Sequence, residues 1–565
     1  MAVDRWMEPR PMHSSLFRNE AAAYFDEMAG PVELADDDAQ AASLRACARA
    51  LRAGTDDDHP ATPSRWLREF AAWGAVPELE AKRLSVPVTL RALGDFLGPG
   101  NAALLRRLRR EAGIVSAPQF RKALLRKEAS LRLLLGDEPF ATLSDRLEAR
   151  ALAPGFWPRH TAQRPSQEIR QWKAWAALND IALAGEARRG CELIERALWV
   201  ASADDPNRAL GRLAALPAAR LEGDPADRVR IEDGNRAPTE ILVVESGRHA
   251  ARTVLETGAR AHLDGLLGLI AERTGSPQEG LPIPRSEEEA YALADLPWIP
   301  PELREGRGEI ARAAKLGVPR LVGCADLRGV FHVHTDWSDG RASIRELTEA
   351  ARARGWEYLG IADHSQAAGY ANGLTPERLA AQAEEIARVQ REFPGVRILR
   401  GVECDVLLDG RLDFDDALLA SLDFVIASIH TGLDMEVEPL TDRVVRAIRH
   451  PATTILGHPS GRLLRERGAS SLDWLRVFQA AAEEGTLLEF NTSPERLDLD
   501  WRLIRAATSL GARLCVNPDA HRLEAFDALA YGIETARKGW LVSEQVFNTL
   551  SRESMEAQLH EKRKR

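Results

Sequence analysis

The chain has 565 residues, more than one hydrophobic core normally organises, so we expect two to four domains. Its apolar and charged content is ordinary for a soluble globular protein, and a formal net charge of −10 argues mildly against a general binder of polyanions. Because it has no long apolar run, no apolar signal region at its start and five scattered cysteines without a CxxC pair, we expect a cytoplasmic protein without membrane spans or disulfides.

The first part of the chain is predicted to be mainly helical. Residues 18–55 indicate two helices rich in Ala and Leu, separated at the sequence GPVELADDD. The acidic, proline-containing stretch 53–64 predicts a loop, and residues 65–150 again predict helices, with a turn at LGPGNAA (97–103). A proline-rich connector covers residues 153–166.

Basic side chains are concentrated between residues 101 and 135, where only Glu111 and Glu128 are acidic. A local stripe of this kind can contact the phosphates of a nucleic acid. A solvated helix face explains the pattern about equally well, so both interpretations stay open. The basic residues are Arg106, Arg107, Arg109, Arg110, Arg121, Lys122, Arg126, Lys127 and Arg132.

From residue 167 to about 300 the pattern becomes mixed. ALWVAS (197–202) and TEILVVE (239–245) are predicted strands, and residues 248–273 are a predicted helix. Residues 282–313 alternate loops and short helices, and a hinge is expected near 315–326. Beyond the hinge, short apolar strands alternate with helices to about residue 540, which indicates a parallel α/β domain.

Seven of these apolar segments each run into a side chain that can bind a metal. A short apolar run is typical of a strand buried on both faces, and ligands at the carboxyl ends of successive strands are how a β/α barrel builds an active site on one rim. The segments are VFHVHTDWSDG (His332, His334, Asp339), YLGIADH (Asp363, His364), ILRGVECD (Glu403, Asp405), FVIASIH (His430), TTILGHP (His458), LLEFN (Glu489, Asn491) and ARLCVNPDAH (Asp519, His521).

A set of nine side chains forms the predicted metal site: His332, His334, Asp339, His364, Glu403, His430, His458, Asp519 and His521. The two histidines of HxH point to the same face of a strand, so they can meet one ion. Imidazole with carboxylate suits manganese, zinc or iron. Nine ligands, one of them a bridging carboxylate, are too many for one tetrahedral ion and enough for three, which could activate water and clamp a phosphoryl group.

Three further polar residues lie near the same predicted rim. Arg462 follows the His458 strand end and could hold a phosphate with two donors, although a surface salt bridge is about as plausible an interpretation. Asn491 and Arg496 are weaker candidates for substrate contact or for capping a loop.

These motifs resemble the PHP (polymerase and histidinol phosphatase) domain over about residues 325–550. The resemblance implies a distorted seven-stranded β/α barrel, and it implies that Glu403, Asp519 and His364 take part in catalysis. It also implies a distribution of ligands: His332, His334, Glu403 and Asp519 on one ion; Glu403, His430 and His458 on a second; Asp339, His364 and His521 on a third.

The segments GRLDFDD, GHPSGRLL, NTSPERLDLD and YGIETARKGW narrow the resemblance to the PHP domain of bacterial family X DNA polymerases. Upstream, residues 19–54 resemble the N-terminal helical domain of that family, LGPGNAALLRRLRREAGI a helix-hairpin-helix, and residues 287–310 the end of the thumb. The implied architecture is multidomain α/β: a helical domain over 1–95, a helix-hairpin-helix or fingers region over 96–165, an α+β palm and thumb over 166–315, and the PHP domain over 325–565.

The palm departs from the family. Gly185, Arg188, Arg189 and Glu192 fit its pattern and Glu186 replaces a serine, whereas Arg196 and Leu198 stand where two magnesium-binding aspartates are expected, and Pro238 or Thr239 stands near the third. Magnesium needs hard oxygen ligands, so we expect polymerase activity to be lost. Compensation by Glu195 and Glu240 is disfavoured.

Three functions remain. The favoured one is a metal-dependent phosphodiesterase acting on DNA in repair, as a 3′-5′ exonuclease with abasic-site cleavage or 3′-end processing as variants. The second is a small-molecule phosphomonoesterase of the histidinol phosphatase type, and the third a non-catalytic DNA-binding scaffold. A front half resembling a polymerase favours the first over the second, and a ligand set open to the rim disfavours the third, because structural sites are usually closed.

Overall fold

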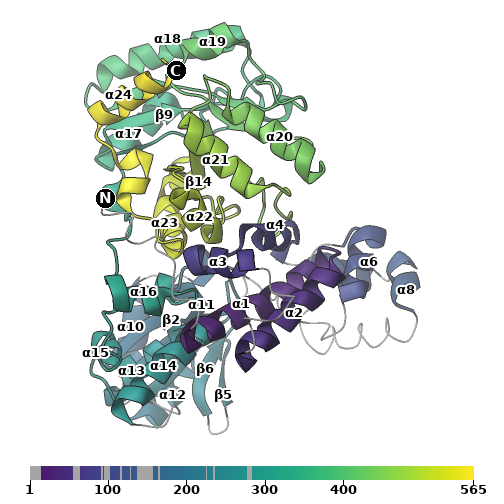
Figure 1. Ribbon diagram of the computed structural model, residues 1–565. Coiled ribbons are helices and arrows are strands. Elements are labelled where there is room, and N and C mark those ends of the chain that lie inside the picture. Colours follow the sequence, from purple (N-terminus) through teal and green to yellow (C-terminus); the bar gives the residue numbers. More distant parts are fainter. Residues whose placement is uncertain are drawn as a thin grey trace. The chain divides into compact units, whose positions relative to one another are not determined.

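The computed structural model describes residues 14–54, 64–88, 90, 93, 102–114, 117–126, 129–136, 157–162, 164, 166–223, 226–232, 236–275 and 283–564. The chain forms two compact units (Figure 1). The N-terminal unit comprises Met1–Val76 and Val86–Val318, and the C-terminal unit comprises Pro77–Ser85 and Pro319–Arg565. Residues 77–85 thus belong with the C-terminal unit, and the expected domain limits stay predictions. Among the described helices, none is long and apolar enough to cross a membrane.

The front of the N-terminal unit is helical, as predicted. Its helices are α1 (Ser15–Leu34), α2 (Asp38–Ala53), α3 (Ser64–Trp73), α6 (Ala102–Ala112), α7 (Ala117–Leu125) and α8 (Ala129–Leu135). Helix α1 continues through Pro31, and the chain turns only at Asp36, whose φ is 68°. The Asp37 side chain then caps α2 by accepting from Gln40 N at 2.9 Å.

The basic stripe is partly neutralised by acids of the same unit. Arg106 contacts Asp38 at 2.7 Å, Arg107 pairs with Glu111 at 2.9 Å, and Arg110 pairs with Asp36. These pairs favour the solvated helix face for α6. The turn predicted at 97–103 falls mostly outside the described residues.

The rest of the N-terminal unit is built on a five-stranded sheet with the order β2–β4–β7–β6–β5. Both predicted strands are present, as β4 (Ala197–Ala203) and β7 (Thr239–Glu245), which pair in parallel. The other strands are β1 (Trp157–Pro158), β2 (Asp180–Ala184), β3 (Leu193–Ile194), β5 (Ala219–Gly223) and β6 (Ala226–Ile231). The helices are α10 (Ser166–Ala176), α11 (Gly185–Arg188), α12 (Pro206–Leu213), α13 (His249–Thr257), α14 (Arg260–Thr274), α15 (Glu287–Ala292) and α16 (Glu309–Leu316).

The single helix predicted over 248–273 is two helices. Gly258 leaves the helical conformation, with φ −66° and ψ 144°, and Ala259 N donates to Arg304 O at 2.9 Å. This hydrogen bond satisfies a backbone donor across the break, and the periodicity of the sequence carries no sign of it.

The C-terminal unit alternates strands with helices, and its strands pair in parallel. They are β8 (Gly329–Val330), β9 (Tyr358–Ile361), β10 (Arg397–Arg400), β11 (Glu403–Asp405), β12 (Ile426–Ser428), β13 (Ile455–Leu456), β14 (Leu487–Asn491) and β15 (Leu514–Asn517). The helices are α4 (Pro77–Ser85), α17 (Ile344–Ala353), α18 (Pro376–Glu392), α19 (Asp416–Ser421), α20 (Val437–Ile448), α21 (Trp474–Glu484), α22 (Trp501–Ser509), α23 (Ala528–Lys538) and α24 (Arg552–Lys562).

Two sheets carry these strands, one with the order β10–β9–β8 and one with the order β11–β12–β13–β14–β15. Single parallel bridges join them, His364 with Glu403 and Val333 with Ala520. The predicted segment ILRGVECD forms two strands rather than one. The parallel pairing agrees with the expected α/β architecture, and the seven-stranded barrel stays a prediction, as do the palm and the other domain limits.

Close packing of an aromatic ring against glycine fixes the strands in the C-terminal unit. Phe424 is fully buried, and a Cβ at Gly401 would lie 2.2 Å from its ring, so only glycine fits there. Phe424 packs edge-on against Phe331, the residue before the HxH motif, with ring centroids 5.2 Å apart.

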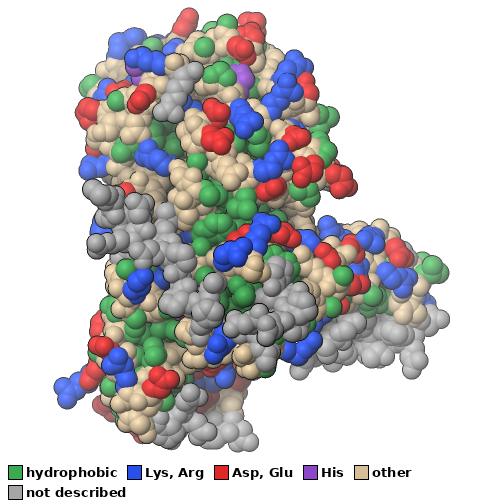
Figure 2. All heavy atoms as spheres, viewed as in Figure 1, with side chains coloured by type: hydrophobic (Ala, Val, Ile, Leu, Met, Phe, Trp, Pro, Cys, Tyr) green, Lys and Arg blue, Asp and Glu red, His purple; other side chains and the backbone are tan. Residues whose placement is uncertain are grey.

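The charged residues on the face seen in Figure 2 are of both signs and interspersed, without a patch of one charge.

Candidate metal centre

Seven of the nine predicted ligands lie just beyond the carboxyl ends of parallel strands, and Glu403 is the first residue of β11, three residues after β10 ends. His332 and His334 follow β8, and His364 follows β9. Glu403 is in β11, and His430, His458 and the pair Asp519 and His521 follow β12, β13 and β15. Asp339 lies on the loop that follows the HxH motif. The structure therefore brings together every residue of the predicted set.

Glu403 is the centre of this cluster. Its side chain is 1% exposed, and its two carboxylate oxygens face different histidines. Oε2 lies 3.4 Å from His332 Nε2, 3.6 Å from His334 Nε2 and 2.9 Å from His364 Nδ1, while Oε1 lies 3.3 Å from His430 Nε2 and 2.9 Å from His458 Nε2. A carboxylate shared in this way has the arrangement of a ligand that bridges two ions.

Four groups of side chains have ligand atoms within 4.8 Å of one another: His332, His334 and Asp519; His332, Glu403 and His458; His364, Glu403 and His430; and His334, Asp339, His364 and His521. The first group resembles the ligand set expected for the first ion, without Glu403. The last group resembles the set expected for the third ion, with His334 added. The middle two divide His430 and His458 between separate groups around Glu403. These clusters can hold metal ions, and the number and identity of the ions stay a prediction.

The donor atoms themselves fit divalent cations. His332 Nε2, both ring nitrogens of His334, His364 Nδ1 and His458 Nδ1 are buried and have no hydrogen-bond partner among the described residues. Buried polar atoms are nearly always paired, and metal ions at this centre would supply partners for nitrogens that face Glu403 and Asp519.

The charge states of the carboxylates suit metal binding. Burial alone would raise the pKa of Glu403, but His364, His332 and His430 hold it well below its usual range. Burial is likewise outweighed at Asp519, where His332 and His334 lower the pKa. Burial, together with His521 and His364, lowers the pKa of His334 to about 4. The centre therefore combines ionised carboxylates with an imidazole that is neutral at physiological pH.

A second layer of buried carboxylates orients the histidines, and its roles were not predicted from the sequence. Glu489 accepts from His332 Nδ1 at 2.7 Å and from the backbone N–H of His458 at 2.6 Å. Asp405 accepts from His430 Nδ1. Such partners fix the tautomer of a ligating histidine and typically change metal affinity by about 10–100-fold. One feature of the sequence could have indicated the role of Asp405. Glu403 and Asp405 are two residues apart, so their side chains lie on the same face of a strand.

Asp363 has a similar structural role. It accepts from Thr335 N at 2.8 Å, from Thr335 Oγ1 at 2.7 Å and from Gln382 Nε2 at 2.5 Å, and it is fully buried. It thereby holds the loop that connects the HxH motif to Asp339. These contacts explain why an acidic residue stands directly before His364 although it is not one of the nine ligand candidates.

Two ligand residues have strained backbones. His458 has φ 22° and Asp519 has φ 51°, in the left-handed region that non-glycine residues seldom adopt. Strain of this kind is retained where the surrounding structure imposes it, and it clusters at functional sites.

The three predicted substrate residues fall into different positions. Arg496 lies at the rim, with Nε 3.5 Å from Asp519 Oδ2 and 19% of its side chain exposed. Asn491 is fully buried and donates to Asp519 Oδ2 at 3.0 Å, so it orients a ligand. Arg462 is 4% exposed; it donates from Nε to Arg496 O at 2.8 Å, from Nη1 to Asp500 and from Nη2 to Leu497 O. The prediction that Arg462 holds a substrate phosphate is therefore wrong, because its donors serve buried acceptors of the protein.

Tyr370 also belongs to the rim, although no sequence pattern pointed to it. It is 74% exposed, and its ring centroid lies 6.2 Å from that of His364 and 6.3 Å from that of His430. Partial desolvation beside the cluster, with nearby Asp405 and Glu403, raises the pKa of Tyr370 to about 12, so the phenol stays neutral. An exposed aromatic ring beside a metal cluster offers a stacking surface.

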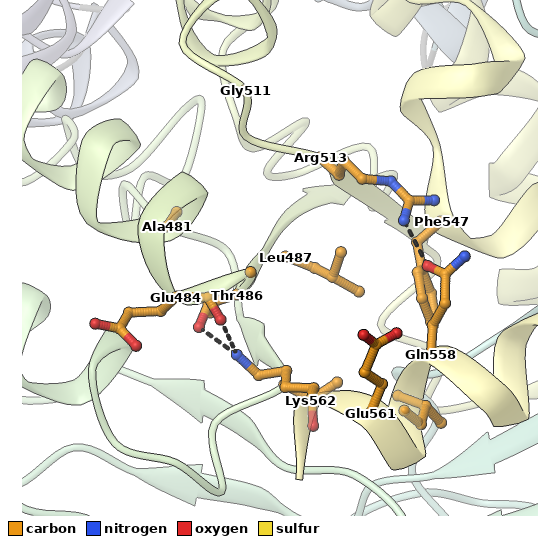
Figure 3. Close-up of a pocket in the computed structure, with 13 residues that line it drawn as sticks. Ala481, Glu484, Thr486, Leu487, Gly511, Arg513, Phe547, Gln558, Glu561 and Lys562 are labelled. Atoms are coloured by element: carbon orange, nitrogen blue, oxygen red, sulfur yellow. Dashed lines mark hydrogen bonds between the residues drawn. The ribbon is translucent and has the colours of Figure 1, made fainter. Parts of the chain in front are cut away.

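A separate cavity of about 290 Å³ lies at the opposite ends of the strands (Figure 3). It is lined by Thr486 and Leu487 at the start of β14 and by Arg513 just before β15. Arg513 donates to Gln558 at 2.6 Å, and Lys562 donates to Thr486 Oγ1 at 2.8 Å. Since the ligands occupy the carboxyl ends, this cavity is not part of the metal centre.

Comparison with known proteins agrees with this geometry. The model of the PHP domain family matches residues 331–493. The chain is 31% identical over 505 residues to the "DNA polymerase/3'-5' exonuclease PolX" of Bacillus subtilis, covering 87% of this chain and 88% of that protein. It is 32% identical over 187 residues to a probable phosphatase of Caldanaerobacter subterraneus, covering 31% of this chain and 71% of the relative. A probable phosphatase of Thermoanaerobacter sp. is 27% identical over 231 residues, or 39% of this chain and 89% of the relative.

Proposed function

The chain belongs to the PolX family of proteins that carry a PHP domain and is a metal-dependent phosphoesterase, and on that premise we propose that it hydrolyses DNA from 3′ ends. The observation that carries the proposal is Glu403, a buried carboxylate in contact with five histidines at one rim of parallel strands. The resemblance to PolX over most of the chain supports DNA as substrate.

The chemistry follows from the positions of the side chains. Metal ions held by the nine ligands would polarise the phosphate and supply hydroxide near neutral pH. Arg496 is placed to bind a non-bridging phosphate oxygen, because its guanidinium lies 3.5 Å from the Asp519 carboxylate and 19% of its side chain is exposed. Glu489 and Asp405 keep the ring nitrogens of His332 and His430 directed toward the centre.

The test is hydrolysis of a 5′-labelled, 3′-recessed duplex and of a 5′-labelled single-stranded oligonucleotide with manganese, using the full chain. We expect metal-dependent shortening that is absent from the variant with both His332→Ala and His334→Ala. Failure of the wild-type protein to shorten either substrate in manganese, zinc or iron would contradict the proposal.

We further propose that polymerase activity has been lost. Arg196 and Leu198 occupy the positions of the expected aspartates, and Leu198 pairs in register with Glu240 on β7. Glu240 is 4% exposed and contacts Arg196 Nε and Arg230 Nη1, each at 3.0 Å. Guanidinium groups thus neutralise Glu240, one of the two acids that could have compensated, and a neutralised carboxylate is a poor ligand for magnesium. Primer extension with magnesium or manganese should yield no incorporated nucleotide.

One observation favours phosphomonoester hydrolysis as a second candidate. Two relatives that match only 31% and 39% of this chain are probable phosphatases, which makes small phosphomonoesters a second candidate substrate class. Rapid turnover of small phosphomonoesters by the full chain, without binding of an oligonucleotide, would favour this function over the first.

Tyr370 provides a prediction that separates the two functions. If the ring stacks on the terminal base, Tyr370→Ala should reduce kcat/KM roughly 5–100-fold on an oligonucleotide, since stacking contributes about 1–3 kcal/mol per base. Tyr370→Phe should remain close to wild type. On an oligonucleotide whose 3′ residue is abasic, wild type and Tyr370→Ala should be equal, and an equal loss on both substrates would contradict base stacking.

A further inference from the structure

A short helix from the front of the chain is an integral part of the C-terminal unit. Helix α4 (Pro77–Ser85) packs against α21 and α22, and Figure 1 shows it beside them although its colour marks an early position in the sequence. The backbone N–H of Ala469 donates to Leu84 O at 2.8 Å. A Cβ at Gly468 would lie 2.4 Å from Ser85 O, so the two backbones are in close contact.

Helix α4 inserts one arginine into the interior of this unit. Arg83 is 3% exposed and lies between two buried carboxylates, Glu80 at 2.5 Å and Asp500 at 3.1 Å. Both carboxylates are fully buried, so the guanidinium compensates charge that water does not reach.

Asp500 connects Arg83 with the loop between β14 and α22. It caps α22 by accepting from Arg502 N at 3.0 Å, and it accepts from Arg462 Nη1. The same Arg462 side chain donates to the backbone carbonyls of Arg496 and Leu497. The Arg462 side chain therefore connects the Asp500 carboxylate with the backbone of Arg496 and Leu497. The position of this backbone determines where the Arg496 side chain lies.

The loop ends at the metal centre. Arg496 Nε lies 3.5 Å from Oδ2 of Asp519, one of the nine ligand candidates. Ser460 N, two residues after the ligand His458, donates to Asp498 of the same loop at 3.0 Å. A series of ion pairs and hydrogen bonds, mostly buried, thus leads from Arg83 through Asp500, Arg462 and the backbone of Arg496 to the rim of the site, and buried polar networks of this kind restrict movement.

We propose that Arg83 is a positioning residue of the phosphoesterase site, acting through Asp500 and Arg462 to hold Arg496 against the metal centre. This inference rests on the proposed phosphoesterase function. It predicts that a residue more than 200 positions before the first ligand affects turnover without touching substrate. Misplacing a group near the reacting atoms by about 1 Å can reduce the rate substantially, by up to about 100-fold.

The experiment uses the full chain with Arg83→Ala, and Arg476→Ala as the matched control. Arg476 is on α21 and pairs with Glu438 at 2.9 Å and Asp442 at 2.6 Å, but it is 39% exposed. We expect Arg83→Ala to lower kcat/KM on an oligonucleotide by on the order of ten-fold, with bound metal unchanged, and Arg476→Ala to stay near wild type. Added guanidinium chloride at low millimolar concentration should partly restore Arg83→Ala.

A double-variant cycle distinguishes positioning from a general loss of stability. If Arg83 acts through Arg496, then Arg83→Ala combined with Arg496→Ala should be no more than about two-fold less active than Arg496→Ala alone. Fully multiplicative losses, or a loss in Arg83→Ala that matches its loss of bound metal, would overturn the proposal. If Arg83→Ala does not fold, Arg83→Lys, which keeps the charge but loses the second contact, is put through the same cycle. A wild-type protein without phosphoesterase activity would instead refute the proposed function.

Discussion

Glu403→Gln is expected to abolish phosphoesterase activity and to strip the centre of most of its metal. Loss of a hydrogen-bond partner of a ligand costs about 10–100-fold in metal affinity or activity, and Glu403 is the group that all the central histidines share, so the loss should exceed that range. The amide has the same shape but carries no charge, and it presents a hydrogen-bond donor to imidazole nitrogens that are directed at a cation. The volume of the side chain is unchanged, so the effect is electrostatic.

The measurement is metal content of the purified variant by mass spectrometry together with kcat/KM on an oligonucleotide. The matched control is Glu438→Gln, because Glu438 is 74% exposed and pairs with Arg476 at the surface. A Glu403→Gln protein that keeps wild-type metal content and more than about one tenth of the activity would refute the bridging role.

Asp500→Asn is expected to cause the largest loss of stability, about 3–5 kcal/mol of the free energy of unfolding. Asp500 is fully buried, and the buried guanidiniums of Arg83 and Arg462 contact it at 3.1 and 2.5 Å, with that of Arg502 at 3.3 Å. Asparagine preserves the shape but leaves three positive charges without their shared counter-charge. Burial alone would raise the pKa of Asp500, but Arg502, Arg83 and Arg462 hold it well below its usual range.

The sign of the pH dependence follows from that shift. A carboxyl whose folded pKa is depressed adds stability above its unfolded pKa, about 3.9, and loses it as the pH falls through the folded value. The difference between wild type and Asp500→Asn should therefore be constant from about pH 5 to pH 8 and shrink below pH 4. Urea unfolding followed by tryptophan fluorescence measures it. Asp409→Asn, at an exposed pair with Arg411, is the control and should change stability by less than about 1 kcal/mol.

The strand-end pattern was sufficient to predict which nine side chains gather at one site, because parallel strands must bring their carboxyl ends to one edge. The structural role of Arg462 could not be predicted from the sequence. Its partner Asp500 is 38 residues away along the chain, and Arg83, which contacts the same carboxylate, is 417 residues from Asp500. Local patterns carry no information about contacts at such separations. Tyr370 was missed for the complementary reason, since an exposed ring has no periodic neighbour to mark it.

Helix α4 also limits which parts of the gene can be deleted without damage to the C-terminal unit. A deletion that removes the front half would remove nine residues, Pro77–Ser85, that complete the back half. A phosphoesterase fragment beginning at residue 319 should consequently expose the buried carboxylate of Asp500 and the faces of α21 and α22 that α4 covers. If polymerase chemistry has been lost, selection on the phosphoesterase alone is then enough to keep this front-half segment in the gene.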